Sequence, residues 1–307
     1  MGFSVKGEWK SDIEWARSEK GAFVRDKSVF RQKISADDNA TFPVEDKRYH
    51  LYVSGACPWA HRVMIVRSLL GLENFVSVST VHPLMMDAGW VFEGPYRDDV
   101  FGAQRLHEVY LRADSAYTGR VTVPILFDRS TDTIVNNESS DIIRMFNDTA
   151  PRTRNLDLDL YPIALQADID LWNDRIYAGL NNGVYRCGFA TTQAAYEEAV
   201  GHLFRVLESI ETHLESRRFM VGNQLTEVDI RLFPTLVRFD AVYHGHFKCN
   251  LRKLNEFPNL YAYTRRMYDV HGVAETCKLS EIKTHYYGSH LTINPTGIIP
   301  VGPETWP

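Results

Sequence analysis

Apolar residues along the chain follow two spacings, one typical of strands and one typical of helices. In the first half, short segments of aromatic or branched apolar residues predict strands at 49–54, 75–81, 121–127 and 133–135. Segments with an apolar side predict helices at 59–70 and 139–146. From residue 162 onward, apolar residues recur every three or four positions, as in amphipathic helices. The pattern therefore predicts an α/β domain followed by an all-helical domain.

The same patterns place the domain boundaries. The α/β domain is expected at 46–150, with a polar and aromatic insertion at about 82–120, and the helical domain at 162–272. Residues 1–45 mix charges with isolated aromatics and show no sustained period, so we expect an extension that packs onto the core. Residues 273–307 are rich in Gly, Pro, His and Tyr, and we expect an irregular tail that packs near the functional site.

One helix start within the second domain carries a specific signal. Thr226 is preceded by Leu225 and followed three residues later by Asp229. A threonine N-cap with an acid at the third helical position forms a capping box, in which two side chains satisfy two exposed backbone N–H groups. We therefore expect a helix to begin directly after Thr226.

Length and charge exclude several classes of function. The chain has 307 residues, enough for two domains, and 34 Lys plus Arg against 39 Asp plus Glu, a net charge of −5. A nucleic-acid partner is not expected, because phosphate binding needs clustered, unbalanced basic residues. No apolar run approaches the roughly 20 residues that span a bilayer, and residues 1–10 lack the apolar core of a secretion signal. We therefore expect a cytoplasmic protein without a membrane partner.

The four cysteines are far apart in sequence and form no C-x-x-C pair, so free thiols in a reducing compartment are expected. Cys57 is the most informative of them, because it lies between the first predicted strand and Pro58, which opens the next helix. The unpaired N–H groups and the dipole of a helix start favour the thiolate, which is the nucleophilic form. Ala60 leaves no local disulfide partner, so an outside thiol would have to resolve a mixed disulfide. The alternative is a small buried residue at a strand-to-helix turn.

Pro124 lies inside the third predicted strand, where a proline removes a ladder hydrogen bond. A bulge or an edge position would explain it. So would a cis peptide bond that presents the backbone of Val123 to a ligand.

A metal site is not expected. The residues His244, His246 and Cys249 are of types that bind zinc, but their spacing is too compact for the usual patterns. No second cluster completes four ligands.

Five features together resemble the glutathione transferase fold: the order of elements, the Cys57-Pro58 turn, the strand proline, Glu138-Ser139 at a helix start and the capping box. This implies a thioredoxin-like N-terminal domain and an all-helical C-terminal domain. Longer strings are similar to those of the Xi class, the glutathionyl-hydroquinone reductases. They are residues 54–62, 89–92, 120–124, 185–190, 246–250 and 285–303.

The resemblance implies an activity. Enzymes of this family use glutathione to release hydroquinone and oxidised glutathione from a glutathionyl-hydroquinone. Here Cys57 would attack the glutathionyl sulfur and form a mixed disulfide, which a second glutathione would resolve. A cysteine fits this thiol exchange better than a serine or tyrosine, because only a thiolate can hold the glutathionyl group as a disulfide.

The resemblance also implies the residues of the site. For the co-substrate glutathione, Val123 before Pro124 would pair with its cysteinyl backbone. Glu138 would hold its amino group, and Ser139 with nearby N–H groups would receive its γ-glutamyl carboxylate. The other residues implied to contact glutathione are Trp90 and Arg120, although Trp90 could also be an interior aromatic residue.

Tyrosine hydroxyls are implied to bind the phenolic oxygens of the hydroquinone. Tyr185 and Tyr287 are favoured, also as catalytic groups that steady developing oxygen charge or help deliver a proton to the ring. Tyr286 is the third candidate, and which of Tyr286 and Tyr287 faces the pocket stays open. The family resemblance also suggests a homodimer.

Two other functions compete with this interpretation. One is an Omega-like thiol transferase that reduces dehydroascorbate, phenacyl-glutathiones or small mixed disulfides through the same cysteine. The other is a non-catalytic homologue that keeps the fold for ligand binding. Turnover that depends on Cys57 distinguishes the enzymes from the binding protein.

Overall fold

The computed structural model describes residues 2–11, 20–37, 39–304 and 306, which form two compact units. We call the first the sheet unit; it comprises the described residues of 1–14, 26–158 and 276–281. The second, the helical unit, comprises those of 15–25, 159–275 and 282–307. After the sheet, the chain passes into the helical unit at residue 159. Part of the N-terminal extension belongs to the helical unit, and residues 276–281 of the C-terminal tail belong to the sheet unit.

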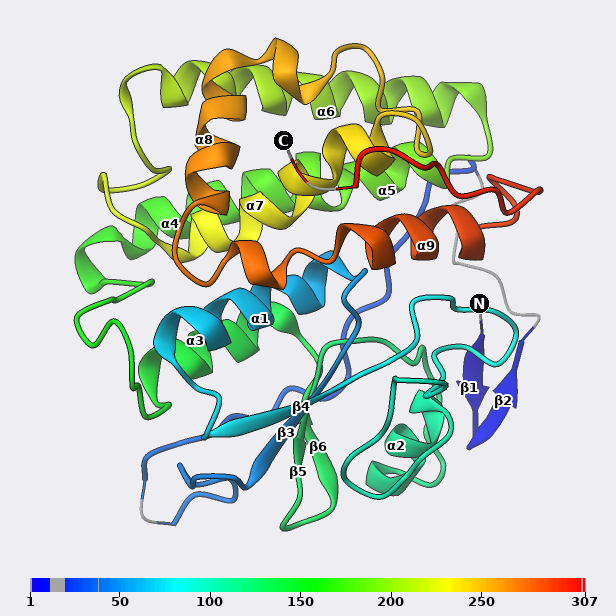
Figure 1. Ribbon diagram of the computed structural model, residues 1–307, viewed down its shortest axis with the longest axis vertical. Helices are drawn as coiled ribbons and strands as arrows, with labels where there is room; N and C mark the ends of the chain where they lie inside the picture. Colours follow the sequence, from blue (N-terminus) through cyan, green and yellow to red (C-terminus); the bar gives the residue numbers. More distant parts are fainter. Residues whose placement is uncertain (1, 12–19, 38, 305, 307) are drawn as a thin grey trace. The chain divides into compact units, whose positions relative to one another are not determined.

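A four-stranded mixed sheet forms the centre of the sheet unit (Figure 1). Its spatial order is β4-β3-β5-β6, with β3 parallel to β4 and antiparallel to β5, and β5 antiparallel to β6. Every residue of β3 is buried, as expected for a central strand. The strands are β3 (Tyr49–Val53), β4 (Val76–Thr80), β5 (Ile125–Asp128) and β6 (Thr133–Asn136).

Helices α1 (Pro58–Leu70) and α3 (Ser139–Asp148) pack against each other, and α2 (Leu106–Ala113) contacts β6. The strands predicted at 49–54, 75–81 and 133–135 are confirmed, as are the helices at 59–70 and 139–146. The predicted strand at 121–127 is wrong at its start, because β5 begins only after Pro124, which has no N–H for the ladder. The Val123–Pro124 peptide bond is cis, as one of the interpretations of the strand proline requires.

Three elements of the sheet unit were not predicted. Strands β1 (Phe3–Val5) and β2 (Glu8–Lys10) form an antiparallel hairpin in the N-terminal extension. Backbone bonds between Ser4 and Gly119, 2.9 Å in both directions, join this hairpin to the end of the insertion. Within the insertion, α2 buries Leu106, Val109 and Tyr110 on one side. That spacing is helical but too short to stand out in the sequence.

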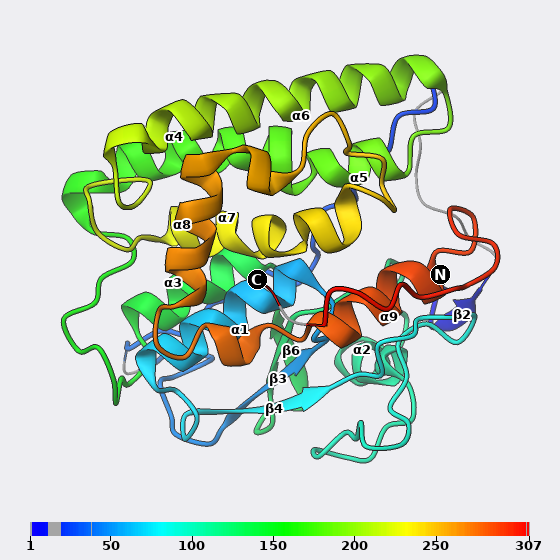
Figure 2. The ribbon, with the colours of Figure 1, turned by 45° about the horizontal axis from the view of Figure 1, so that its top comes forward.

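The helical unit confirms the predicted change to helical spacing. Figure 2 shows its long helix α6 (Gln193–His213) beside α5 (Gly183–Gly188). Its other α-helices are α4 (Gln166–Ile176), α7 (Glu227–Arg238) and α8 (Pro258–Tyr268), and α9 (Leu279–Ser289) begins in the sheet unit. Shorter turns of 3-10 or π type lie at Ile163–Leu165, Tyr177–Asn181, Leu214–Ser216, Phe239–Tyr243, Leu254–Glu256 and Ala274–Thr276.

The predicted helix start after Thr226 is confirmed, with both bonds of the capping box present. The expectation of an irregular C-terminal tail is wrong for residues 279–289, because α9 buries Leu279, Ile282 and Tyr286 at helical spacing. Among the residues that the structure describes, no helix is long and apolar enough to cross a membrane.

A buried histidine in β3 predicts a pH dependence of stability. Burial lowers the pKa of His50 from 6.5 to about 4. Its Nδ1 lies 2.7 Å from Ser77 Oγ, and its Nε2 has no partner among the described residues. The folded protein therefore keeps His50 neutral at pH values where the unfolded chain binds a proton, so stability falls as the pH drops from 6.5 to about 4. Over that range, His50→Gln should remove roughly 3 kcal/mol of the decrease in the free energy of unfolding.

Urea unfolding at several pH values measures this effect. The exposed His271 supplies the control variant, His271→Gln, which should leave the decrease unchanged. Equal pH slopes for wild type and His50→Gln would contradict the prediction.

Candidate active site

Cys57 occupies the N-cap of α1, with the extended backbone angles φ −75° and ψ 123°. Its carbonyl accepts the His61 N–H at 3.0 Å, which starts the helix, and its own N–H donates to the Ser54 carbonyl at 3.1 Å. Pro58 takes the first helical position, where its missing N–H costs nothing. The Cys57 side chain is partly exposed. A nucleophile that must meet a substrate needs such a position.

The strand proline and the cysteine turn meet in space. Cys57 Sγ lies 3.5 Å from the carbonyl oxygen of Val123, the residue before the cis Pro124. The two segments are 66 residues apart, so the sheet register brings them together: β3 leads into the cysteine turn, and its partner β5 follows the proline. The sulfur therefore lies beside a stretch of backbone that is outside the strand ladder.

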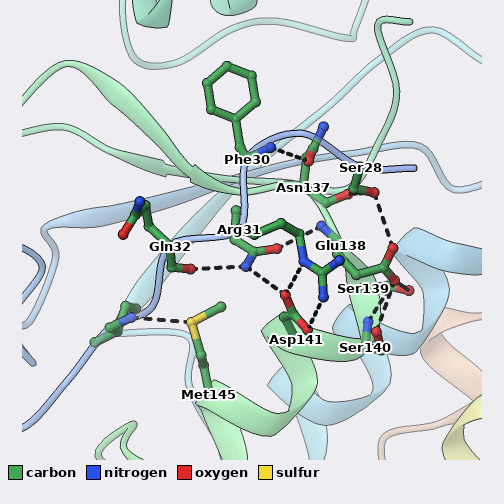
Figure 3. Close-up of polar contacts among 12 residues, drawn as sticks. Ser28, Phe30, Arg31, Gln32, Asn137, Glu138, Ser139, Ser140, Asp141 and Met145 are labelled. Carbon is green, nitrogen blue, oxygen red and sulfur yellow. Dashed lines mark hydrogen bonds and ion pairs between the residues drawn. The ribbon is translucent and has the colours of Figure 1, made fainter. Parts of the chain in front are cut away.

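Glu138 and Ser139 lie at the N-terminus of α3, as the sequence indicated (Figure 3). Glu138 is the N-cap residue, and its Oε1 accepts the Ser140 N–H at 3.1 Å and the Ser140 hydroxyl at 3.1 Å. Ser139 Oγ lies 3.4 Å from the same oxygen. This helix start combines a carboxylate and hydroxyl groups with the positive end of the helix dipole, a set that can receive both the amino and the carboxylate group of an amino acid.

Arg62 of α1 adds a positive charge beside this helix start, and the sequence alone gave no signal for its role. Its guanidinium is almost fully buried, stacks over the Trp59 ring at 4.5 Å and donates to Ser139 Oγ at 3.5 Å. A cation behind Ser139 favours an anion at that hydroxyl. Helical spacing places position 62 on the buried side of α1, as in the structure. It does not show that the Arg62 guanidinium contacts Ser139.

Trp90 and Arg120 lie at the two ends of the insertion. Trp90 is 6% exposed, and its carbonyl accepts the Leu106 N–H at the start of α2. The Arg120 side chain is 8% exposed, and its Nε lies 3.1 Å from Asp26 Oδ2. The guanidinium also lies over the Phe3 ring, 5.7 Å from its centroid. The N-terminal extension thus positions the Arg120 side chain.

A carboxyl group at the start of α9 lies close to the cysteine turn, and sequence reasoning missed it. A Cβ atom at Gly55 would lie 2.2 Å from Glu281 Oε2, so only glycine leaves room for the carboxyl group. Burial raises the pKa of Glu281, and Tyr96 of the insertion interacts with it. Nearby, His61 Nε2 lies 2.8 Å from Thr276 Oγ1 and 3.8 Å from Cys277 Sγ. Residues 276–281 therefore form part of the surroundings of the cysteine turn.

The tyrosine candidates lie in the helical unit. The Tyr185 and Tyr286 hydroxyls are 2.6 Å apart, and Tyr286 is 3.0 Å from the hydroxyl of Tyr243, which the sequence did not single out. Burial raises the pKa of Tyr286 and of Tyr243 well above 10, so both stay protonated at neutral pH. Tyr287 does not join this chain of hydroxyls: it donates to the Ala241 carbonyl at 3.2 Å.

Tyr185 also interacts with Tyr243, and a cation lies over its ring. The Arg25 guanidinium carbon lies 4.7 Å from the Tyr185 ring centroid, and Arg25 Nε donates to Asn182 Oδ1 at 2.8 Å. A cation near a phenol favours negative charge on its oxygen. Of the three tyrosines, Tyr185 therefore has the surroundings best suited to developing oxygen charge.

His246, one of the residues whose type suits zinc, contacts another histidine instead. His246 Nε2 lies 3.2 Å from Nδ1 of His290, and burial lowers the pKa of His246 to about 4 and that of His290 well below 6.5. Two neutral imidazoles can share one hydrogen bond. Within residues 2–11, 20–37, 39–304 and 306, no three His, Cys, Asp or Glu side chains are grouped to hold a metal ion. Cys249 is buried nearby, and burial raises its pKa well above 9.

Two family models match this chain. The model described as "Glutathione S-transferase, N-terminal domain" matches residues 56–149, which include Cys57, Val123 and Glu138. The model described as "Glutathione S-transferase, C-terminal domain" matches residues 193–266. The two matches confirm the predicted combination of a thioredoxin-like and an all-helical domain.

Individual relatives define the class. The chain is 50% identical to the glutathionyl-hydroquinone reductase PcpF of Sphingobium chlorophenolicum over 99% of its own length and 96% of the relative. The crystal structure of a glutathione transferase Xi of Phanerochaete chrysosporium is similar with a TM-score of 0.91 and 48% identity, covering 96% of this chain and 97% of the other.

The glutathione-bound structure of YqjG, a glutathione transferase homologue of Escherichia coli, is similar with a TM-score of 0.84 and 48% identity. It covers 90% of this chain and 92% of the other. Identity of this extent over nearly the whole length confirms the resemblance seen in the Cys57-Pro58 turn and the strand proline. The chain belongs to the Xi-class glutathione transferases, the family of the glutathionyl-hydroquinone reductases.

Proposed function

We propose that this protein removes glutathione from glutathionyl-hydroquinones and releases the hydroquinone and oxidised glutathione. The observation that carries the proposal is the position of Cys57, a partly exposed thiol at the N-terminus of α1 with its sulfur beside the Val123 carbonyl. A helix start favours the thiolate, and the thiolate is the form that attacks sulfur. The relatives named as glutathionyl-hydroquinone reductases support the choice of substrate.

The reaction has two sulfur exchanges. In the first, the Cys57 thiolate attacks the glutathionyl sulfur, a disulfide between Cys57 and glutathione forms, and the carbon–sulfur bond of the ring breaks. The electron pair of that bond leaves with the ring, which takes up a proton and becomes the free hydroquinone. In the second, the thiolate of another glutathione attacks the mixed disulfide, which yields oxidised glutathione and restores the Cys57 thiolate.

The sheet unit supplies the groups for glutathione, the co-substrate. We assign the backbone of Val123, before Pro124, to its cysteinyl backbone, Glu138 to its amino group and Ser139 to its γ-glutamyl carboxylate. The buried Arg62 supports the last assignment, because its charge lies 3.5 Å from the Ser139 hydroxyl. Trp90 and Arg120 complete the proposed set, with Arg120 already engaged by Asp26. No step requires a metal ion.

The helical unit supplies the groups for the aromatic ring. We assign Tyr185 and Tyr287 to the phenolic oxygens, with Tyr286 as their neighbour. Because Tyr286 is fully buried and bonded to both Tyr185 and Tyr243, it can polarise the Tyr185 hydroxyl from behind. Tyr287 would exchange its bond to the Ala241 carbonyl for one to the substrate. These hydroxyls can steady the charge on the ring oxygens or help protonate the ring carbon.

We also propose that the protein acts in the cytoplasm as a homodimer. Free thiols, which all four cysteines retain, are typical of reducing compartments. Light scattering in solution measures the oligomeric state directly.

An assay with a glutathionylated menadiol tests the proposed function. Protein and excess glutathione should release hydroquinone and oxidised glutathione in equal amounts, since each turnover joins two glutathionyl sulfurs. Without added glutathione, a single turnover should leave one glutathionyl group on the protein, visible by mass spectrometry.

The same experiment separates the competing functions. A higher kcat/KM for dehydroascorbate or a phenacyl-glutathione than for the hydroquinone adduct would favour an Omega-like transferase. Binding of glutathione with no turnover of any of these substrates would favour a non-catalytic binding protein.

A further inference from the structure

A segment of the N-terminal extension adds an edge to the central sheet. We call residues 28–35 the edge segment; it runs antiparallel to β6 at the bridge between Arg31 and Asn136. The Gln32 N–H donates to the Val135 carbonyl at 2.9 Å, and the Asn137 N–H donates to the Phe30 carbonyl at 3.1 Å. The extension therefore pairs with the strand that leads directly into Glu138.

Side chains of α3 fix the edge segment in register (Figure 3). Arg31 forms a bidentate pair with Asp141, with distances of 2.5 and 2.9 Å. Burial opposes ionisation of Asp141, but the bonds from Arg31 and Asn136 outweigh it and lower its pKa. The pair is thus charged on both sides at neutral pH. Farther along, the Ile34 N–H points to Met145 Sδ at 3.2 Å.

Ser28 begins the edge segment and reaches Glu138. Its hydroxyl donates its one proton between two acceptors, Glu138 Oε2 at 3.1 Å and the Asn137 carbonyl oxygen at 3.2 Å. The two oxygens of Glu138 are used differently: Oε1 accepts from the groups of the α3 start, whereas Ser28 is the one donor to Oε2 among the described residues. A carboxylate oxygen has room for two donors. Oε2 is therefore oriented by Ser28 and can still accept from a ligand.

We propose that Ser28 is a positioning residue of the glutathione site: it fixes Glu138 Oε2 to receive the ammonium group of the γ-glutamyl moiety. The N-terminal extension thereby becomes part of the binding site. This inference rests on the proposed function, because it requires that Glu138 holds the amino group. Without the hydroxyl, binding must order the Glu138 side chain, and we expect this ordering to weaken the affinity by about three- to tenfold.

Calorimetric titration of the full chain with two ligands tests the proposal. The first ligand is S-methylglutathione, which cannot react with Cys57, and the second is its analogue with glutaryl in place of γ-glutamyl, which lacks the amino group. Ser28→Ala should weaken the binding of S-methylglutathione by about three- to tenfold and leave the binding of the analogue unchanged. Ser28→Thr, which keeps the hydroxyl, should restore the affinity. Ser35→Ala is the matched control, because its hydroxyl bonds Asp37 in the same extension.

Other results of these titrations would contradict the role of Ser28 or that of Glu138. Equal weakening of both ligands by Ser28→Ala, or no change in either, would overturn the proposed role of Ser28. Glu138→Gln tests the underlying assignment separately, since glutamine keeps an acceptor for the α3 start but loses the charge. If Glu138→Gln lowers affinity only for the ligand with the amino group while Ser28→Ala does not, the function stands and this inference fails. If Glu138→Gln weakens both ligands equally, the role of Glu138 and that of Ser28 are both wrong.

Discussion

Cys57→Ser is expected to lower kcat for hydroquinone release roughly a thousandfold or more. The alcohol is a far weaker nucleophile than a thiolate at neutral pH, and an oxygen at this position cannot hold the glutathionyl group as a disulfide. The Cys57 side chain makes no capping hydrogen bond to the first turn of α1, so serine should preserve the turn. The loss should therefore be one of chemistry and not of folding.

Steady-state assays with the menadiol adduct measure this loss, and mass spectrometry should find no glutathionyl group on the variant. Cys277→Ser is the matched control, because Cys277 is another partly exposed thiol of the sheet unit and lies beside His61 of α1. It should retain close to wild-type turnover. If Cys57→Ser kept more than about a tenth of the activity, the proposed thiol exchange would be wrong.

Asp229→Ala should lower the free energy of unfolding by roughly 3–5 kcal/mol. The Asp229 carboxylate is fully buried in the helical unit and accepts four hydrogen bonds. Their donors are the N–H of Met220 at 3.0 Å, the N–H and hydroxyl of Thr226 at 2.9 and 3.1 Å, and the Tyr263 hydroxyl at 2.8 Å. Alanine would leave these buried donors without an acceptor and remove half of the capping box.

Urea unfolding, followed by circular dichroism of the helices, measures the change. Tyr263→Phe removes one of the four donors and should cost only about 1 kcal/mol. Asp229→Asn keeps an acceptor and should lie between the two. A loss below about 1 kcal/mol for Asp229→Ala would show that the network contributes little to stability.

The elements that could be predicted are those whose signal is local. The apolar spacing of α6, the capping box at Thr226 and the Cys57-Pro58 turn each lie within a few residues, and each is present in the structure. The prediction of a strand before Pro124 was wrong because two rules conflict there. The side chains of residues 121–123 favour a strand, whereas a proline cannot donate to the ladder.

The parts of the site that could not be predicted depend on contacts between distant segments. Ser28 approaches Glu138 across 110 residues through a β-bridge, and no pattern near Ser28 indicates it. Glu281 lies against Gly55 because the chain returns there after residue 275. Tyr243 likewise bonds Tyr286 from another helical segment. Sequence spacing identifies which faces are apolar, but it does not identify which distant side chains meet.

The contact between Gly55 and Glu281 constrains how this protein can change over time. The loop that carries the reactive sulfur and the first turn of α9 share a space in which one additional methyl group would displace a carboxylate. A larger residue at position 55 therefore needs a shift or shortening of the Glu281 side chain, although the two positions lie more than two hundred residues apart. A designer who grafts the cysteine loop onto another scaffold would have to transplant both segments together.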